Sequence, residues 1–253
     1  MTAAASSPKV VLHQLPPSHP CATVRRALTL KGLEYERVDL TFGRHNGEAE
    51  AIYGAGATTV PGVVIDDEPV HGTVAILRRL EELRPDVAPL YPAALGTALK
   101  DAEEWADGEL QDLGRRLPWA ALHFRPERFG ALLGQPPLDG AGTDFAIRAI
   151  RGGWKYHGIT AERLQSDLAG LPALFEQIDG FVADGLMGGE APTALDLHVG
   201  ATIRVLAMAE DLRPLLRATR AWESAQRWFP IGESSVPAGA YPEGWVPEAP
   251  APR

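Results

Sequence analysis

The spacing of apolar residues along the chain changes once, at a proline-rich stretch. This change constrains the possible fold more than any other feature of the sequence. Before residue 84, short apolar runs alternate with helical spacing in the order β-α-β-(α)-β-β-α. Residues 84–92 carry three prolines and predict a linker. After it, helical spacing recurs and no segment has the pattern of a strand. The sequence therefore predicts an α/β domain followed by an all-α helical bundle.

The first half divides into short elements with different periodicities. Continuous apolar runs are typical of strands buried on both faces, and alternation is typical of a half-buried strand. The two clear helices begin near Cys21 and at Thr73, whereas residues 41–57 are polar and glycine-rich and receive no assignment. The expected strands are residues 9–15, 34–40, 63–65 and a short fourth one around Val70.

The second half is predicted to be helical, with interruptions at proline and glycine. Thr193 and Asp196 match a capping box that opens an almost wholly apolar, and therefore buried, helix. A loop or broken helix is expected at residues 118–142, and a tail, extended or disordered, at 230–253. Helices are expected at residues 94–116, at 161–184 with a break near Gly170 and Pro172, and at 212–228. The predicted domains are residues 1–90 and 94–229, followed by the tail.

Charge and cysteine content exclude several classes of function. A net charge of −9 and a pI of about 5.3 argue against a nucleic-acid partner and against binding to anionic membranes. No apolar run approaches the ~20 residues that span a bilayer, and residues 1–8 lack the pattern of a secretion signal. The single cysteine, Cys21, excludes an internal disulfide and a multi-cysteine zinc site. We therefore expect a cytoplasmic protein without a metal.

Three short motifs, in this order and spacing, resemble those of the glutathione transferase superfamily. They are the turn Ser18-His-Pro-Cys21, the segment Thr59-Val60-Pro61, and Gly72-Thr73-Val-Ala-Ile76 at the start of a helix. The resemblance covers most of the chain up to Trp228. It implies a thioredoxin-like N-terminal domain that binds glutathione or a related thiol, an all-helical C-terminal domain, and a homodimer. It implies no cofactor beyond that thiol co-substrate.

The active-site turn contains two candidate catalytic residues. Ser18 stands at the predicted start of a helix, where unpaired N–H groups and the helix dipole favour negative charge. Its hydroxyl either donates to a bound thiolate and lowers the thiol's pKa, or simply caps the helix. Cys21 is the second choice: it either forms a mixed disulfide with the thiol or is a small buried residue.

The remaining candidates flank this turn. His13 ends the first strand, near the place where some classes of the family carry a catalytic tyrosine; His13 and His19 are either catalytic or structural. By resemblance, Val60 precedes a cis-proline, Pro61, and pairs its backbone with the thiol peptide. Thr73 corresponds to the serine that binds the γ-glutamyl carboxylate, with helix N-cap as its alternative role. Gly72 departs from the Glu or Gln that often meets the γ-glutamyl amine, which puts tight glutathione binding in doubt.

These features favour an enzyme that activates a small thiol for attack on an apolar electrophile. Two other functions stay open: a non-catalytic binding module on the same fold, and a thiol-dependent isomerase or reductase. Arg115, Arg116, Arg148 and Arg151 are expected to be solvated rather than ligand-binding. Five aromatic residues of the second half are expected either to lie in the core or to line a pocket for a second substrate. They are Trp105, Trp119, Phe124, Trp154 and Tyr156.

Overall fold

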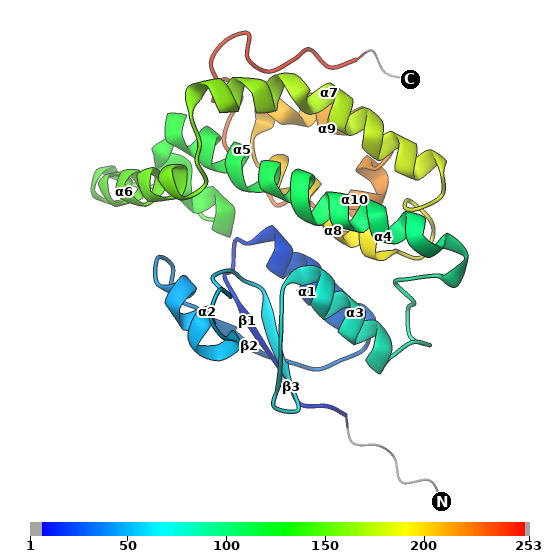
Figure 1. The fold of residues 1–253 in the computed structure, drawn as a ribbon. Helices are drawn as coiled ribbons and strands as arrows, with labels where there is room; N and C mark the ends of the chain where they lie inside the picture. Colours follow the sequence, from blue (N-terminus) through cyan, green and yellow to red (C-terminus); the bar gives the residue numbers. More distant parts are fainter. Residues whose placement is uncertain (1–6, 251–253) are drawn as a thin grey trace, which may run out of the picture. The chain divides into compact units, whose positions relative to one another are not determined.

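The computed structural model describes residues 7–250, and the chain divides into two compact units, residues 1–96 and 97–253 (Figure 1). Most of the segment examined for a secretion signal, residues 1–6, lies outside the described residues, as do the last three residues of the tail. Within residues 7–250, no helix combines the length and the apolar character needed to cross a membrane.

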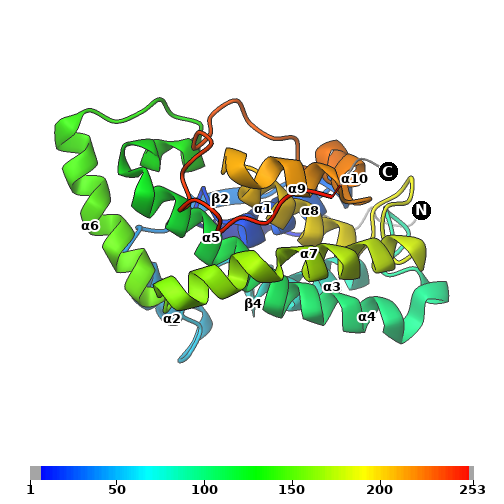
Figure 2. The same cartoon turned by 90° about the horizontal axis from the view of Figure 1, so that it is seen from above.

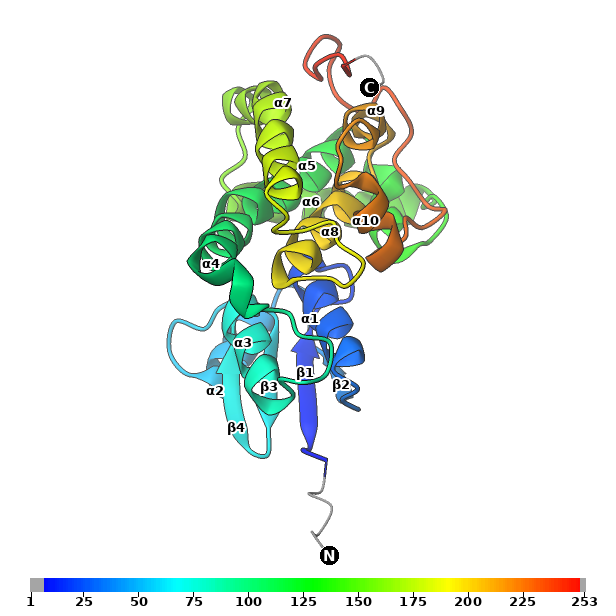
Figure 3. The ribbon, with the colours of Figure 1, turned by 90° about the vertical axis from the view of Figure 1, so that its right-hand side faces the viewer.

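The first unit is built on a four-stranded mixed sheet with the strand order β2-β1-β3-β4 (Figure 3). Strand β1 pairs parallel with β2 and antiparallel with β3, and β4 is antiparallel to β3. The predicted order of elements is confirmed, and the unassigned segment contains the helix α2. The elements are β1 (Val10–Gln14), α1 (His19–Leu30), β2 (Glu36–Asp39), α2 (His45–Tyr53), β3 (Gly62–Ile65), β4 (Glu68–His71) and α3 (Thr73–Leu83).

The core of this unit follows the predicted stripe of α3, whereas the first strand, expected to be buried on both faces, is fully buried on one face only. Alternate residues of β1 are buried, and the apolar stripe of α3 with Ile76, Leu77 and Leu80 is fully covered. One buried charge interrupts this apolar core. The Lys31 side chain, 0% exposed, is paired with the Glu81 carboxylate and donates to the Arg84 carbonyl at 3.0 Å. Such a pairing is required because an unpaired ammonium is very costly to bury.

Up to Trp228 the second unit is built of helices, as predicted. A long helical path at its start combines η1, α4, a wider π-type turn η2, and α5. The elements are η1 (Ala93–Leu95, which begins before the unit boundary), α4 (Gly96–Trp105), η2 (Ala106–Leu110), α5 (Gln111–Phe124), η3 (Pro126–Leu133), α6 (Gly140–Tyr156), α7 (Ala161–Ala183), α8 (Ala194–Leu206), η4 (Glu210–Leu212), α9 (Arg213–Arg217) and α10 (Trp222–Trp228).

Two predicted helix breaks at proline were wrong. Helix α5 continues through Pro118 to Phe124, and α7 is a single helix that continues through Pro172. A proline inside a helix costs ~3 kcal/mol, whereas each large apolar side chain that becomes buried contributes ~1.5–3 kcal/mol. Helix α7 buries five such side chains along its length, so packing outweighs the proline. These are Leu164, Leu168, Leu171, Phe175 and Ile178.

The last predicted helix, residues 212–228, is instead three pieces. The chain turns after α9, where the Thr219 hydroxyl donates to the Leu216 carbonyl at 2.8 Å. The Asp179 carboxylate of α7 accepts from the Arg220 N–H at 2.7 Å, just before α10 begins. A contact from a distant helix therefore lies at the break, and the local sequence pattern did not predict it.

The capping box is confirmed, and the tail is packed rather than disordered. Thr193 accepts from the Asp196 N–H, and the Asp196 carboxylate accepts from the Thr193 N–H at 2.9 Å. Between residues 230 and 250 the chain is irregular and crosses the helical unit (Figure 2). Val236 bridges to Ala209, and Tyr241 is buried with its hydroxyl donating to the Leu117 carbonyl at 2.9 Å.

Candidate functional site

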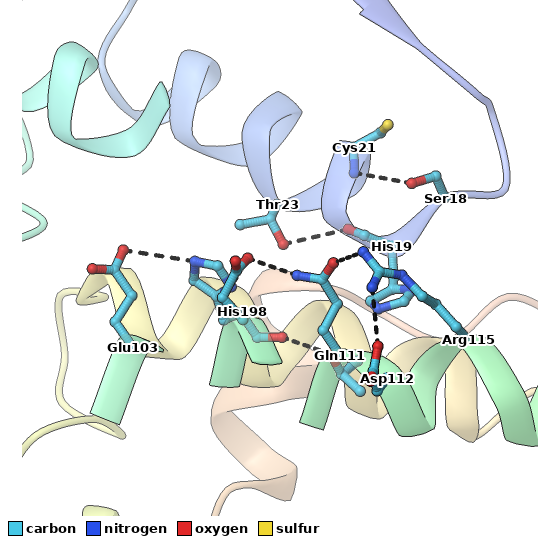
Figure 4. Close-up of polar contacts among 11 residues, drawn as sticks. Ser18, His19, Cys21, Thr23, Glu103, Gln111, Asp112, Arg115 and His198 are labelled. Atoms are coloured by element: carbon cyan, nitrogen blue, oxygen red, sulfur yellow. Dashed lines mark hydrogen bonds and ion pairs between the residues drawn. The ribbon is translucent and has the colours of Figure 1, made fainter. Parts of the chain in front are cut away.

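Ser18 is the N-cap of α1. Its backbone is extended, and its hydroxyl oxygen accepts from the Cys21 N–H at 3.3 Å (Figure 4). The capping role considered for Ser18 is therefore observed. It does not exclude the catalytic role, because capping uses a lone pair of the oxygen and the hydroxyl hydrogen keeps its capacity to donate. The half-buried side chain stands at a helix terminus that favours negative charge.

Cys21 is a core residue of the first unit. Its side chain is 0% exposed and packs in a cluster with Leu15 and Val60, against which the half-buried Leu40 also packs. Burial raises the pKa of its thiol, although the hydrogen bond with Ser18 acts in the opposite direction. The geometry therefore favours the small buried residue over the reactive thiol.

The three motifs meet within the first unit. Cys21 of the first motif contacts Val60 of the second, and the Val60–Pro61 peptide bond is cis, as predicted. The Pro61 carbonyl then accepts from the Gly72 N–H at 3.1 Å, which joins the third motif. A continuous series of contacts thus links the start of α1, the cis-proline segment and the start of α3.

The backbone at the start of α3 explains why glycine stands at position 72, where the family often has Glu or Gln. Gly72 is the N-cap and has a φ of +91°, a conformation that glycine adopts freely and L-residues rarely do. The alternative role of Thr73 as the N-cap was wrong: Thr73 is the first helical residue and is buried. Its backbone N–H lies among the unpaired donors of the helix start, where a carboxylate is favourable.

Around the cis-proline, at residues 58–61, the carbonyl groups are occupied at every position but one. The Thr58 carbonyl accepts from Asn46 Nδ2 at 2.8 Å, and the Thr59 carbonyl from His71 Nε2 at 2.9 Å. The Pro61 carbonyl accepts from the Gly72 N–H, so among these four residues only the Val60 carbonyl has no donor. Within residues 7–250, neither the N–H nor the C=O of Val60 makes a hydrogen bond.

His13 is bound to a partner that the sequence did not suggest. Its Nδ1 lies 2.6 Å from the Tyr53 hydroxyl, and burial lowers the pKa of the imidazole, which favours its neutral form. This bond favours the structural reading of His13. His19 is buried, and its carbonyl accepts from the Thr23 hydroxyl at 3.3 Å (Figure 4).

In the helical unit, one of the arginines expected to be solvated is buried. Arg116 forms a two-pronged pair with Asp167, with Nε and Nη2 at 2.6 and 2.9 Å from the carboxylate oxygens. The carboxylate of α7 draws it inward, and a planar guanidinium suits this geometry. Arg148 and Arg151 are exposed as predicted.

The aromatic residues proposed for a second-substrate pocket are dispersed over several contacts. His123 joins Phe124 and Trp154 through ring contacts at 5.2 and 4.3 Å, while Trp119 contacts Phe129. Trp105 instead packs on Phe181 of α7, and Tyr156 is 56% exposed. These side chains therefore form separate ring contacts and do not converge on one site.

The helical unit also contains a buried pair of polar side chains, Glu103 and His198, that was not predicted from the sequence. The side chains of Glu103 and His198 point toward each other (Figure 4), with His198 Nε2 3.6 Å from the carboxylate. The other ring nitrogen lies 3.7 Å from Asp107. The two carboxylates face opposite ring nitrogens, so they do not converge on one point. Among the described residues, no group of histidine, cysteine and carboxylate side chains is arranged to hold a metal ion.

Comparisons with known proteins identify the first unit and its fold. Residues 12–88 match the family model described as glutathione S-transferase, N-terminal domain. The search of curated proteins gave no match.

Several solved structures share the fold at low sequence identity. A glutathione S-transferase from Rhodospirillum rubrum F11 is 18% identical with a TM-score of 0.54, covering 94% of this chain and 98% of its own. A maleyl pyruvate isomerase, described as a bacterial zeta-class glutathione S-transferase, is 18% identical with a TM-score of 0.55, covering 89% and 100%. Rice GST1 in complex with glutathione is 17% identical with a TM-score of 0.51, covering 90% and 81%. Residues 12–88 therefore carry a glutathione S-transferase N-terminal domain, and the chain shares the fold of solved glutathione transferases, with a thioredoxin-like part followed by a helical part.

Proposed function

We propose that the chain is a glutathione-transferase-like enzyme that activates glutathione or a related thiol for attack on an electrophilic small molecule. The observation that carries the proposal is the open backbone of Val60, flanked by carbonyl groups that are all occupied. A peptide-like thiol completes the missing pair of hydrogen bonds there. Rice GST1, a structural neighbour, is described in complex with glutathione, which supports the same ligand class.

In the proposed reaction, the chain's own residues bind the thiol and stabilise its ionised form. The backbone of Val60 pairs with the thiol peptide, and the N–H groups at the start of α3, near Thr73, hold a carboxylate. Ser18 donates its hydroxyl hydrogen to the sulfur, which lowers the thiol's pKa so that its proton passes to solvent. The sulfur lone pair then forms a bond to the electrophilic carbon, and the leaving group departs with the bonding pair.

The decisive experiment compares Ser18→Ala with Cys21→Ala. Removing a hydrogen bond to a charged sulfur costs ~1.5–3 kcal/mol, so the bound thiol's pKa should rise by about one to two units. Turnover of a chlorinated nitrobenzene near neutral pH should fall ~10- to 100-fold in Ser18→Ala. Binding of S-methylglutathione, which has no thiol to ionise, should change little, and Cys21→Ala should be nearly silent.

The opposite pattern has a defined meaning. If Cys21→Ala abolishes activity and Ser18→Ala does not, the protein is a thiol-disulfide reductase and the role of Ser18 is wrong. An isomerase on this fold is tested in the same assay with an unsaturated dicarbonyl compound as substrate. The zeta-class maleyl pyruvate isomerase among the neighbours makes this reaction class the first to try.

A specific observation favours a second candidate, a non-catalytic binding module. Gly72 supplies no carboxylate where the family often has one, and its φ of +91° suits glycine. Retention on immobilised glutathione, with a mycothiol-type ligand in parallel, separates the two. Retention with turnover supports the enzyme, whereas the absence of both supports the binding module. The twofold homodimer implied by the family stays a prediction, and a monomeric mass in light scattering at micromolar concentration contradicts it.

A further inference from the structure

The segment between α2 and the cis-proline is held by side chains from two different elements. Asn46 of α2 donates to the Thr58 carbonyl, and His71 of β4 donates to the Thr59 carbonyl, at 2.8 and 2.9 Å. A carbonyl can only accept, so His71 Nε2 carries a hydrogen. The two bonds lie on the two residues that directly precede Val60. Neither donor, Asn46 or His71, belongs to the three motifs that identified the site.

The imidazole of His71 packs against the ring of Tyr53. The two rings lie 5.5 Å apart with an interplanar angle of 39°, and the Tyr53 hydroxyl is anchored 2.6 Å from His13 Nδ1. Tyr53 reaches this position because β3 has a glycine there: a Cβ on Gly62 would lie 2.2 Å from the tyrosine ring.

The sheet register explains why one tyrosine meets both histidines. Gly62 is paired with His13 on one side and with His71 on the other, so the three residues are neighbours across β1, β3 and β4. Side chains of directly paired residues lie on the same face of a sheet. Tyr53, at the end of α2, covers this row.

We propose that His71 and Asn46 are positioning residues that present the Val60 backbone to the thiol peptide, an inference that rests on the proposed function. The segment they hold follows two glycines with positive φ, Gly54 and Gly56, which give it conformational freedom. Fixing the Thr58 and Thr59 carbonyls sets the peptide plane that leads into Val60. The ligand then meets a segment that is already ordered, which favours binding.

The test uses two substitutions of the same residue in the full-length protein. His71→Phe keeps a ring against Tyr53 but lacks the donor, whereas His71→Gln supplies an N–H at a similar reach. Titration calorimetry with S-methylglutathione should show ~5- to 10-fold weaker binding for His71→Phe, the effect expected for one neutral hydrogen bond. His71→Gln should recover most of this loss, and turnover at saturating thiol should be unchanged. Glu68→Gln, on the same strand, is the control.

A second measurement needs no ligand. In nuclear magnetic resonance spectra of the free protein, the Val60 amide should give one sharp signal in the wild type. In His71→Phe it should broaden or divide, and in His71→Gln it should be restored.

The two measurements separate the possible failures. A wild type that binds neither S-methylglutathione nor a mycothiol analogue overturns the proposed function, while the Val60 signal still decides whether His71 orders this segment. An unchanged Val60 signal in His71→Phe overturns the positioning role. Equal affinity losses in both His71 variants also overturn it, because loss of packing rather than loss of the donor would then be the cause.

Discussion

The two units use their buried polar groups in different ways. In the helical unit, the Asp196 carboxylate is occupied by the protein itself: it accepts from the Thr193 and Gly188 N–H groups and from the Ser224 hydroxyl. Asp211 likewise accepts from the N–H groups of Gly239 and Ala240 in the tail. In the thioredoxin-like unit, the polar contacts around the cis-proline stop at Val60 and leave its backbone open.

This difference indicates which polar groups stabilise the fold and which ones are available to bind a ligand. Buried polar groups are nearly always paired, so an open pair of backbone groups beside an ordered segment is a signal for a ligand. Saturated carboxylates such as Asp196 instead join segments that are distant in the chain. We therefore expect substitutions in the helical unit to reduce stability, and substitutions near Val60 to reduce binding.

The largest effect is expected from removing the Asp196 carboxylate, the hydrogen-bonding hub of the helical unit. Asp196→Ala leaves three donor residues without their acceptor, and each unsatisfied buried donor costs ~1–3 kcal/mol. We expect a loss of about 4 kcal/mol in the free energy of unfolding. All six tryptophans lie between Trp105 and Trp245, so urea unfolding followed by tryptophan fluorescence reports on this unit alone. The exposed Asp184→Asn is the control, and a loss below ~1 kcal/mol in Asp196→Ala would contradict the role of the hub.

The next effect concerns the buried ion pair of the thioredoxin-like unit. Lys31→Met leaves the Glu81 carboxylate, 19% exposed, without its cation. Breaking a buried pair costs ~3–5 kcal/mol, and the partial exposure of Glu81 places the expected loss near ~3 kcal/mol. Hydrogen exchange in β1 and α1, read by mass spectrometry, measures the loss in this unit.

A double variant sharpens that result. Lys31→Met combined with Glu81→Gln removes the uncompensated charge and retains an acceptor for the Leu90 N–H, which Glu81 holds at 3.0 Å. It should therefore recover most of the stability. If it is as unstable as the single variant, lost packing of the lysine stem is responsible instead.

A smaller effect is expected where the tail meets the helical unit. Tyr241→Phe keeps the buried ring and removes only its hydrogen bond to the Leu117 carbonyl. The expected loss is ~1 kcal/mol, measured by the same fluorescence method. Tyr156→Phe, at a residue 56% exposed, should change nothing. Equal results for the two variants would show that the tail does not contribute to stability through this bond.

The smallest effect is expected at Cys21, in native thiol labelling. Burial raises its pKa above the ordinary 9.0, so the thiol stays protonated in the folded protein through neutral pH and reacts little with an aromatic disulfide reagent. Denatured protein should release one equivalent, from the single cysteine. Fast native labelling would contradict the buried assignment.

The same shift gives a pH dependence with a defined sign. Above pH 9 the unfolded chain loses the Cys21 proton first, so the contribution of this group to stability declines as pH rises toward its raised pKa. Wild type should therefore lose more stability than Cys21→Ala between pH 8 and pH 10, and parallel curves would contradict the shift.

The sequence by itself determined the elements whose patterns are local. The apolar run that forms β1, the apolar stripe of α3, the capping box at Thr193 and the motif around Pro61 depend on residues close together in the chain. Short-range periodicity and capping express the same physical preferences in the sequence as in the fold, so these features were predicted correctly.

Only the tertiary structure decided the features that depend on distant partners. Helix α7 passes through Pro172 because its buried face outweighs one missing hydrogen bond, and Arg116 is buried because Asp167 lies opposite it. Tyr53 meets His13 and His71 only because the sheet register places Gly62 between them. Such contacts join residues far apart in the chain, and their energies arise only once the segments have packed, so no local pattern records them.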